Sequence, residues 1–563
     1  MRLSPLGLAV SESLKTAKYL LLVVAPVGAA VGVAIAAYDW IVNELLWNHV
    51  ARLSLAVQIA APAVGMCLTG LLLHLFRVRS SSMADEVVSA YHDPEVNMPV
   101  EQATGKLAAS ITTMGLGASA GMEGASKWLG ATTALLLQRQ FDRLHSLRWS
   151  HRTTMLAGGS AGIAAIFRAP LSGAIMGVES PFKHDLAHEA LLPALVASAV
   201  SFSVFTHFRP ATPYFPISFH YGPTARDLLV AVPLGLSAGI ASHLFLGTLT
   251  RLRDGFTKHV LSIPIRTTIG GLLLSLLAYA SYRFVGRPVT LQAGLPVAND
   301  LLNGHFVLAA CVAIFVLKLA ATAITFGSGG VGGLFVPTAT IGAALGACWD
   351  ALVPGSQPGM FTLLGVAAFS GASYNSLLFS AVFIAEATGN VFLVVPALIA
   401  CGVAFITTAG ISNSRAQRER RPDTDDLLAK VPIERIMTRR IVTMAPDQPL
   451  RDFSESVLLG HHFRALPVIA NDGTFRGMVR VEQLRRVPMT EWGNVLVAHI
   501  MDDKANVLCP HHSVADAVRA LGNGKHDYVP IVDPLTYRLI GIVSNTDLHR
   551  VSVKGSKPYS PLS

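Results

Sequence analysis

Long apolar segments run through most of this chain, and several of them are interrupted by glycine or proline. Residues 19–42 and 55–77 are each long enough to cross a bilayer as a helix. Many later segments are too short to cross alone. Lipid offers no hydrogen bonds, so a broken helix is tolerated at membrane depth only where protein or a cavity surrounds it. The sequence therefore predicts a polytopic membrane protein in which broken helices line an interior site.

The composition supports a membrane protein with a soluble addition. Apolar residues make up 52% of the 563-residue chain and charged residues 14%, with a mean hydropathy of +0.49. Arginine and lysine concentrate in short loops and in the last quarter, so the pI of about 9.4 reflects membrane topology, and no nucleic acid is expected as a partner. Lys15 and Lys18 precede the first span and predict a cytoplasmic N-terminus. The cysteines are widely spaced singles, which predicts neither a disulfide framework nor a metal site.

A single carboxylate, Glu123, stands between glycines in the middle of the apolar region. Helical spacing precedes Gly115 and resumes after Ser126, so the glycines mark a break between two helices. The start of the second helix has unpaired N–H groups and partial positive charge, which together attract anions. An ionisable group at this depth is a candidate functional residue. An ordinary glutamate in a first helical turn, favoured by the dipole alone, is an equally good interpretation of this stretch in isolation.

The same pattern occurs again later in the chain. The matching stretches are Gly121–Ala125 with Gly333–Pro337, Gly130-Ala131 with Gly342-Ala343, and Pro170 to Glu179 with Leu377 to Glu386. Short, glycine-interrupted segments at matching positions of two halves are typical of transporters built from inverted repeats. Chance matching of glycines in a glycine-rich chain is the alternative.

These motifs resemble the CLC family of chloride channels and chloride/proton antiporters over about residues 15–412. Gly121-Met122-Glu123-Gly124-Ala125 is similar to the family's Gly-Arg/Lys-Glu-Gly-Pro, and Gly333-Leu334-Phe335-Val336-Pro337 to its Gly-Ile-Phe-Ala-Pro. The resemblance implies an all-α polytopic membrane domain, an inverted repeat with broken helices, that forms a homodimer. It implies chloride as the transported ion, with other halides or nitrate as further candidates, and protons as a second partner. Glu123 would be the gate and proton acceptor. The anion-binding positions implied are Ser82, Gly121, Met122, Gly124, Gly333, Leu334, Phe335 and Ser412.

Three positions depart from the family's pattern. Ser82 stands at the chloride-coordinating serine, but the flanking glycines and proline are absent. Ser180 occupies the place where antiporters of the best-known type carry an inner proton-transfer glutamate, and it cannot relay a proton by titration. Its neighbour Glu179, also on that inner proton route, is expected to be a helix-end residue exposed to water. The family's central tyrosine is expected to be missing, with Ser412 in its place and no aromatic residue nearby.

The last quarter contains a second repeat, with a period of about 64 residues. Each unit is predicted to contain a short strand, a helix, two further strands and a terminal helix. This α/β pattern resembles a pair of CBS domains, a module that often binds adenine nucleotides. The ribose-binding signature is matched by Ser544, Thr546 and Asp547, although Asp547 is equally well explained as a helix cap. In the first unit Glu482-Gln483 replaces the signature, so that site is expected to be disabled.

The expected mechanism is an anion path where helix ends converge, because neutral dipoles suit a permeating ion better than a fixed cation. Ionised Glu123 would occupy the anion's own place, and protonation would open the path, so acid should increase flux. Phe335 would give a hydrophobic wall beside the gate. Ser180 and the expected lack of the tyrosine favour channel-like or weakly coupled chloride movement. Proton/chloride antiport and a fluoride-selective pore are the alternatives.

Other classes of function fit the sequence less well. A cation transporter with CBS domains would need several membrane carboxylates, and an intramembrane metalloprotease would need His-Glu-x-x-His, which is absent. A membrane-anchored nucleotide sensor without transport would not need two broken helices. We expect no enzyme activity and no required cofactor. The expected parts are a transmembrane domain 1–412, a basic linker 413–430, CBS domains 431–493 and 494–556 on the cytoplasmic side of an inner or plasma membrane, and a tail 557–563.

Overall fold

The computed structural model describes residues 13–419 and 431–548, except 79, 94–95, 97, 145–149, 211, 218–221, 223, 261, 354–356, 457–464, 486, 522–527 and 545. The chain divides into two compact units, one ending at Arg421 and the other beginning at Pro422. The greater part of the predicted linker, from residue 420 to 430, and the predicted tail 557–563 lie outside the described residues.

The first unit is helical. Its first half contains η1 (Leu20–Val24), α2 (Ala25–Asp39), η2 (Trp40–Trp47), α3 (Asn48–Arg52), α4 (Leu55–Leu75), α5 (Met83–His92), η3 (Val100–Gln102), α6 (Ala103–Gly115), α7 (Glu123–Leu144), α8 (His151–Phe167), α9 (Pro170–Glu179) and α10 (His188–Phe208). Its second half contains α11 (Ala225–His259), α12 (Ile263–Val285), α13 (Leu295–Leu302), α14 (Leu308–Gly327), α15 (Phe335–Leu352), α16 (Met360–Tyr374), α17 (Leu377–Thr388), η4 (Val391–Leu393) and α18 (Val394–Thr408). Within the described residues, 8 helical segments are long and apolar enough to cross a membrane.

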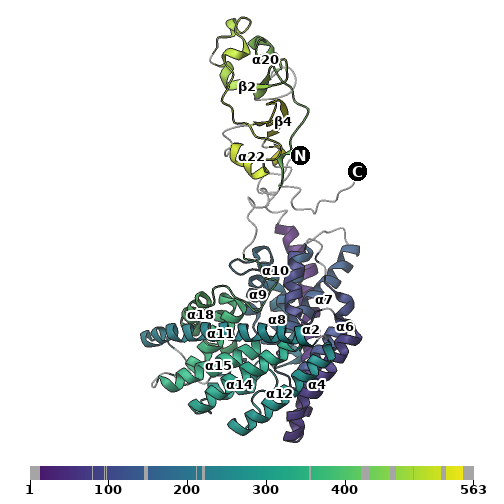
Figure 1. Ribbon diagram of the computed structural model, residues 1–563, viewed down its shortest axis with the longest axis vertical. Coiled ribbons are helices and arrows are strands. Elements are labelled where there is room, and N and C mark those ends of the chain that lie inside the picture. The colour runs from purple at the N-terminus through teal and green to yellow at the C-terminus, as the bar shows by residue number, and fades with distance from the viewer. Residues whose placement is uncertain are drawn as a thin grey trace. The chain divides into compact units, whose positions relative to one another are not determined.

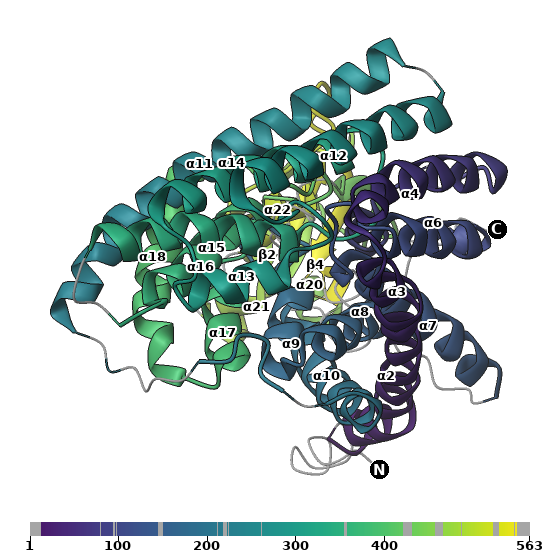
Figure 2. The same ribbon diagram turned by 90° about the horizontal axis from the view of Figure 1, so that it is seen from below.

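The two halves lie side by side and repeat the same packing (Figure 1, Figure 2). Helix α7 packs on α8 as α15 packs on α16, and α2 packs on α10 as α11 packs on α18. The backbone repeats as well. Arg168 ends α8 in the left-handed region at φ 54°, and Asn375 ends α16 at the same φ of 54°. The matching stretches of the sequence therefore reflect a true structural repeat.

Glycine contacts explain why these helix pairs approach so closely. A Cβ on Gly130 of α7 would collide with the carbonyl of Gly158 in α8, and a Cβ on Gly342 of α15 would collide with that of Gly365 in α16. Small residues let helix backbones touch where lipid supplies no hydrophobic driving force. Gly130 and Gly342, which match in the sequence repeat, thus lie at equivalent helix–helix contacts in the two halves.

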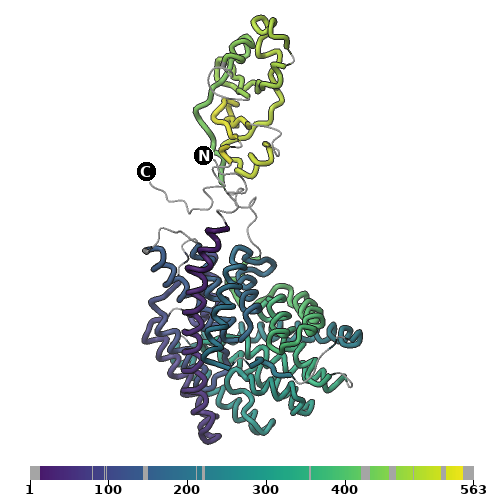
Figure 3. Tube along the Cα trace, turned by 180° about the vertical axis from the view of Figure 1, so that it is seen from behind, coloured from purple at the N-terminus to yellow at the C-terminus, as the bar shows by residue number. Residues whose placement is uncertain are grey.

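The second unit is the α/β part of the chain, and Figure 3 traces it in yellow-green at the end of the colour range. Its strands form two antiparallel pairs, β1 (Ala465–Ile469) with β2 (Phe475–Arg480) and β3 (Tyr528–Val532) with β4 (Leu539–Ser544). Its helices are η5 (Ile433–Arg435), α20 (Leu450–Ser456), α21 (Val481–Leu484), η7 (Met489–Glu491), η8 (Val497–His499) and α22 (Val514–Leu521).

The first predicted strand of each soluble repeat is only a single bridge in the structure. Met444 pairs in parallel with Val468 of β1, and Leu508 pairs in parallel with Ile531 of β3. Prolines at 446 and 510 follow these positions and cannot donate a further ladder hydrogen bond, which keeps each pairing short.

Candidate functional site

The two helix breaks predicted from glycine meet at one point. Helix α7 begins at Glu123 and α15 begins at Phe335, each after an irregular, glycine-rich stretch. Between them, the N–H of Gly121 donates to the carbonyl of Gly333 at 2.7 Å, and the N–H of Gly333 donates to that of Gly121 at 2.6 Å. This reciprocal pair satisfies the open backbone and holds the two helix N-termini together. It also uses the N–H groups of Gly121 and Gly333, which corrects the expectation that they donate to an anion.

Glu123 reaches from the first half to the second. Its side chain is 2% exposed, and its Oε1 accepts a hydrogen bond from the N–H of Phe335 at the start of α15. Oε2 is buried and has no hydrogen-bond partner among the described residues. The carboxyl group lies over the Cα atoms of Gly121 and Gly333, where a Cβ on either residue would collide with it. The glycines therefore make room for the carboxylate at the positive end of α15.

Two cavities meet at this carboxylate. One, which we call the wide cavity, has a volume of about 350 Å³ and is lined by Gly121, Met122 and Glu123 together with α2, η2 and the loop before α13. The other, the narrow cavity, has a volume of about 30 Å³ and is lined by Glu123 and Gly124 on the other side. Glu123 is the one residue that lines both among the described residues. A group in this position separates the two cavities.

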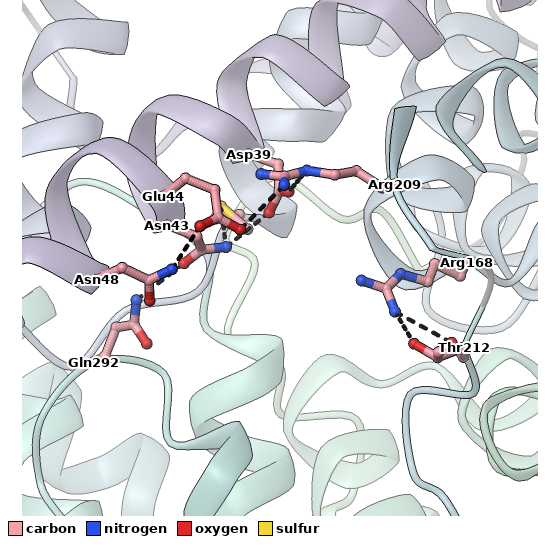
Figure 4. Close-up of polar contacts among 9 residues, drawn as sticks. Asp39, Asn43, Glu44, Asn48, Arg168, Arg209, Thr212 and Gln292 are labelled. Carbon is pink, nitrogen blue, oxygen red and sulfur yellow. Dashed lines mark hydrogen bonds and ion pairs between the residues drawn. The ribbon is translucent and has the colours of Figure 1, made fainter. Parts of the chain in front are cut away.

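The wall of the wide cavity carries a polar network (Figure 4). Arg209 contacts Asp39 at 2.7 Å and Glu44 at 3.1 Å, so the two carboxylates share one guanidinium. Asn43 donates to Asp39 at 2.7 Å and accepts from Gln292 at 3.1 Å, which ties the first half to the second.

Arg168 stands apart from this network on the wall of the same cavity (Figure 4). Its guanidinium donates to the hydroxyl of Thr212 at 2.6 Å, and no carboxylate among the described residues lies within 4.0 Å of it. An uncompensated guanidinium beside a cavity raises the local concentration of anions.

A tyrosine lines the narrow cavity, although no aromatic residue was expected near the site, and Ser412 does occupy the position of the family's central tyrosine. Tyr374, the last residue of α16, lines the cavity, and its hydroxyl accepts a hydrogen bond from the N–H of Leu334 at 3.1 Å. The expectation that no tyrosine lies near the site was therefore wrong. The repeat carried the signal, because aligning Leu377 with Pro170 places Tyr374 opposite Phe167 at the end of α8.

Two serines predicted as anion ligands do not line this cavity. Ser82 donates its hydroxyl to Asp85 at 3.0 Å, and Asp85, not Ser82, faces the cavity. Ser412 donates to the backbone carbonyl of Tyr374 at 3.3 Å, so it supports the tyrosine from behind. Ser82 opens α5 without the flanking glycines that would let the backbone turn its hydroxyl inward.

Ser180 does line the narrow cavity, and its hydroxyl accepts a hydrogen bond from Lys127 at 2.7 Å. Sequence reasoning did not single out Lys127, which lies on α7 one turn after Glu123. The charge could have been noticed, since the first turns of α7 had been assigned to the interior of the membrane.

Glu179 is buried, which corrects the expectation of a water-exposed helix end. It is 8% exposed, and its two oxygens accept hydrogen bonds from the N–H groups of Leu378 at 3.1 Å and Phe379 at 3.0 Å, at the start of α17. Glu386 near the end of α17 returns the contact, accepting from the N–H of Leu171 at 3.0 Å and of Ser172 at 2.6 Å, at the start of α9. The glutamate of each helix therefore caps the N-terminus of the other, α9 capping α17 and α17 capping α9.

The ring of Phe335 lies in an aromatic cluster behind the site. Its centroid is 5.1 Å from that of Phe167, 4.9 Å from that of Phe379 and 5.8 Å from that of Tyr374. These spacings are typical of packed aromatic pairs. The ring is 1% exposed and lines neither cavity, so its backbone N–H, rather than its side chain, reaches the site.

The chain that leaves the membrane unit lies against the end of the narrow cavity. Asn413, Ser414 and Gln417 line that cavity. Just beyond them, the carbonyls of Arg418 and Glu419 accept hydrogen bonds from the N–H groups of Lys183 at 2.8 Å and His184 at 3.0 Å. We call this pairing the exit strip.

In the second unit the predicted nucleotide residues come together. Ser544, Thr546 and Asp547 line a cavity of about 230 Å³ with Arg440 and Tyr528. Asp547 accepts hydrogen bonds from the backbone N–H of Ser544 at 3.0 Å and from its hydroxyl at 2.7 Å, which are capping contacts.

The corresponding cavity of the first repeat is smaller, about 90 Å³, and contains an Arg480–Asp502 ion pair of 3.2 Å. Gln483, one of the residues that replace the signature, accepts a hydrogen bond from the N–H of Arg480 at 2.7 Å. Across the described part of both units, no group of three His, Cys, Asp or Glu side chains is arranged to hold a metal ion.

Both units of the chain match families of known proteins. The family model for voltage gated chloride channels matches residues 64–409, and the CBS domain model matches residues 433–489 and 497–554. The voltage-gated ClC-type chloride channel ClcB of Salmonella typhimurium is 27% identical over 71% of this chain and 98% of its own length.

Two solved structures share the fold of the membrane unit. A slow cyanobacterial Cl⁻/H⁺ antiporter superposes with a TM-score of 0.61 at 20% identity, covering 69% of this chain and 94% of its own. A CLC-type fluoride/proton antiporter superposes with a TM-score of 0.61 at 22% identity, covering 75% of this chain and 100% of its own. Together the matches cover both units of the chain.

Proposed function

The chain belongs to the voltage-gated chloride channel (CLC) family, a family of transporters rather than enzymes, with two CBS domains in its last quarter, and we propose that it moves chloride past a gate formed by Glu123. One observation carries the proposal: Glu123 is the residue that both the wide and the narrow cavity share within the described chain. Its carboxylate accepts a hydrogen bond from the N–H of Phe335 at the start of α15, a donor that would otherwise be available to an anion.

Gating follows from the unequal oxygens of this carboxylate. Ionised, the group occupies the positive end of α15, the place where an anion would bind. Protonation removes its charge and weakens its hold on the Phe335 N–H, while Oε2 has no partner among the described residues to keep it in place. The side chain then moves aside, and the N–H of Phe335 and the hydroxyl of Tyr374 become available to chloride. Flux should increase as the pH falls.

The wide cavity would supply the ion. Arg168 presents a guanidinium with no described carboxylate in contact, whereas Asp39 and Glu44 are both engaged by Arg209. Chloride is therefore attracted to the cavity and not repelled by its acidic wall. Because the narrow cavity adjoins the exit strip, we assign it to the cytoplasmic side, together with the N-terminus and both CBS domains.

We retain channel-like or weakly coupled movement as the first candidate for coupling. Ser180 offers no titratable carboxyl group on the narrow side, which favours it. Proton/chloride antiport is the second candidate, and the specific observation in its favour is Tyr374, because the expected lack of a tyrosine barrier was one of two arguments against coupling. Fluoride as the ion is a further alternative, since Ser82 does not face the cavity.

The deciding experiment is a liposome assay that records chloride efflux and external pH together. The unchanged protein is compared with Glu123→Gln and with Glu386→Gln, a matched carboxylate that also accepts backbone N–H groups but lines neither cavity. Chloride efflux that Glu123→Gln increases and makes independent of pH, without proton movement, supports the gated pore. Proton uptake driven by chloride and lost in Glu123→Gln establishes antiport. No chloride efflux from any of the three proteins would refute the proposal and direct the assay to fluoride.

The CBS pair is proposed to bind an adenine nucleotide in the cavity lined by Ser544, Thr546 and Asp547. The support is the size of the cavity, about 230 Å³, and the presence of Arg440 on its wall as a partner for phosphate. A shift of the unfolding midpoint with ATP, ADP or AMP that Asp547→Ala removes would establish binding. The same samples, sized by light scattering in detergent, would test the homodimer that the family suggests.

A further inference from the structure

The wide cavity has room for a molecule much larger than chloride. Its volume of about 350 Å³ lies within the range of about 300–1,000 Å³ that is typical of small-molecule sites. Such sites are mostly apolar, with a few polar groups that orient the ligand. Apolar side chains form much of this wall too, among them Trp47, Phe205 and Leu295. The cavity therefore has the size and the lining of a site for a small organic molecule.

At one place on this wall, Arg168 has a free hydrogen-bonding edge. Both of its hydrogen bonds run from Nη1 to Thr212, one to the hydroxyl at 2.6 Å and one to the carbonyl at 3.2 Å. Figure 4 shows the guanidinium turning a single nitrogen toward Thr212, and Nε and Nη2 have no partner among the described residues. These two nitrogens form the edge that binds a carboxylate through two parallel hydrogen bonds. The hydroxyl of Tyr214, which lines the same cavity, likewise has no hydrogen-bond partner in the described chain.

A second place on the wall, apart from Arg168 in Figure 4, can accept further hydrogen bonds. Arg209 supplies one positive charge to two carboxylates, and Glu44 is the more open of the two, with 46% of its side chain exposed against 12% for Asp39. Oε1 of Glu44 accepts from Arg209 at 3.1 Å, and Oε2 accepts from Asn48 at 2.7 Å. An ionised carboxylate can accept about four hydrogen bonds. Glu44 therefore has acceptor positions left for an ammonium group.

We propose that the wide cavity binds a small amino acid as a zwitterion, with the carboxylate of the ligand on the free edge of Arg168 and its ammonium group at Glu44. The hydroxyl of Tyr214 donates a further hydrogen bond to the same carboxylate. A zwitterion contacts both places at once, whereas chloride can use only the first. It also adds no net charge to a wall that includes the carboxylate of Glu123.

A ligand bound in this way covers Glu123 from the wide cavity, so chloride efflux should fall when the site is filled. The effect on efflux rests on the proposed chloride path. The binding itself does not, because it depends only on the groups of the wide cavity.

The first test uses the unchanged protein and a series of ligands. Glycine, β-alanine, 4-aminobutyrate and 6-aminohexanoate are titrated calorimetrically in detergent, together with butyrate and butylamine, each of which has one charged end. The amino acid of the best length should bind more tightly than either single-charge ligand by about 10- to 100-fold, as expected for one further charge-assisted contact. Butyrate or butylamine binding as tightly as the best amino acid would overturn the proposal, as would a lack of binding by all four amino acids.

Two variants separate the two ends of the ligand. Arg168→Gln should weaken binding of the best amino acid and of butyrate by about 10- to 100-fold and leave butylamine unaffected. Glu44→Gln, which retains the ion pair between Arg209 and Asp39, should weaken the amino acid and butylamine and leave butyrate at least as tightly bound. Misfolding would weaken all three ligands together, so it cannot produce this opposite pattern. Arg251→Gln, at an exposed arginine of α11, is the control and should alter none of them. Equal affinity for the amino acid in Arg168→Gln and the unchanged protein would refute the inference.

The liposome assay tests the effect on efflux, with the best amino acid present on both sides of the bilayer. Chloride efflux should fall as the site is filled, and Arg168→Gln should need about 10- to 100-fold more amino acid for the same fall. Efflux that is unchanged at a saturating concentration would show that the bound ligand does not cover Glu123. Because binding is measured without flux, a protein that binds the amino acid but moves no chloride would refute the proposed function alone.

Discussion

Glu123 and Glu179 invite comparison because each is a buried carboxylate of the first half that accepts N–H groups from a helix N-terminus of the second half. They differ in how many of their carboxylate oxygens accept a hydrogen bond. Both oxygens of Glu179 have backbone partners, whereas Oε2 of Glu123 has none among the described residues. Glu179 also lines neither cavity, while Glu123 lines both. A fully bonded carboxylate holds two helices together, whereas the half-bonded Glu123 is the one that we propose moves as a gate.

The largest effect is expected from Glu179→Ala. It leaves the N–H groups of Leu378 and Phe379 unsatisfied in the interior, and hydrogen bonds to a charged acceptor contribute about 1.5–3 kcal/mol each. The variant should lose about 3–6 kcal/mol of stability. Thermal unfolding in detergent measures the change, and an unaltered midpoint would show that Glu179 is not the clamp inferred here.

A smaller loss, with a large change in flux, is expected from Gly333→Ala. The added Cβ would collide with the carboxyl group of Glu123, so the side chain is displaced and chloride efflux becomes insensitive to acid. Overpacking of this kind costs about 1–3 kcal/mol. Gly247→Ala is the matched control, because a Cβ there meets nothing within 4 Å. Efflux from Gly333→Ala that still rises in acid would contradict the position assigned to the gate.

Tyr374→Phe should have a modest effect on stability. It removes the acceptor of the Leu334 N–H beside the gate, a contact of 3.1 Å, and one neutral hydrogen bond contributes about 0.5–1.5 kcal/mol. The freed N–H makes the site less selective, so the ratio of chloride to nitrate flux should fall. The liposome assay measures that ratio; a value equal to that of the unchanged protein would separate Tyr374 from the ion path.

The smallest change in stability is expected from Glu123→Ala. The variant loses the contact with Phe335 but also removes a buried oxygen that has no partner in the described chain, and these effects oppose each other. The unfolding midpoint should correspond to a change within about 1 kcal/mol, while efflux rises. A loss of stability as large as that of Glu179→Ala would mean that Glu123 also holds two helices together, and the distinction between the two residues would be wrong.

The parts of the site that the repeated glycines mark could be predicted from the sequence. Glu123, the break before it and the matching break before Phe335 follow from local backbone requirements, and the family match and the fold confirm the CLC-like architecture. The CBS pair was likewise visible as a repeat, and both domains are confirmed. Such repeats are visible in a sequence because equivalent positions of the two copies make the same close contact or turn, and therefore need the same type of residue.

The errors arose where a contact depends on a distant segment. Tyr374 was not predicted because it lies at the end of α16, nearly forty residues before Ser412, and nothing in the sequence near Ser412 indicates that the two are in contact. Glu179 was expected in water because its partners, the N–H groups of α17, are two hundred residues away and leave no mark beside it. The sequence shows Lys127 beside Glu123, but not its contact with Ser180, which is 53 residues away.

The exit strip determines how a mechanical signal could reach the narrow cavity. Its contacts join backbone to backbone, from Lys183 and His184 to Arg418 and Glu419, only a few residues beyond Ser180. A pull along the chain at Glu419 is therefore carried by main-chain hydrogen bonds, with the ion pair between Lys183 and Glu419 at 2.8 Å beside them. Most substitutions in the strip would leave these main-chain hydrogen bonds intact, whereas proline at position 184, which has no N–H, would remove the one to Glu419 and leave the one from Lys183 to Arg418.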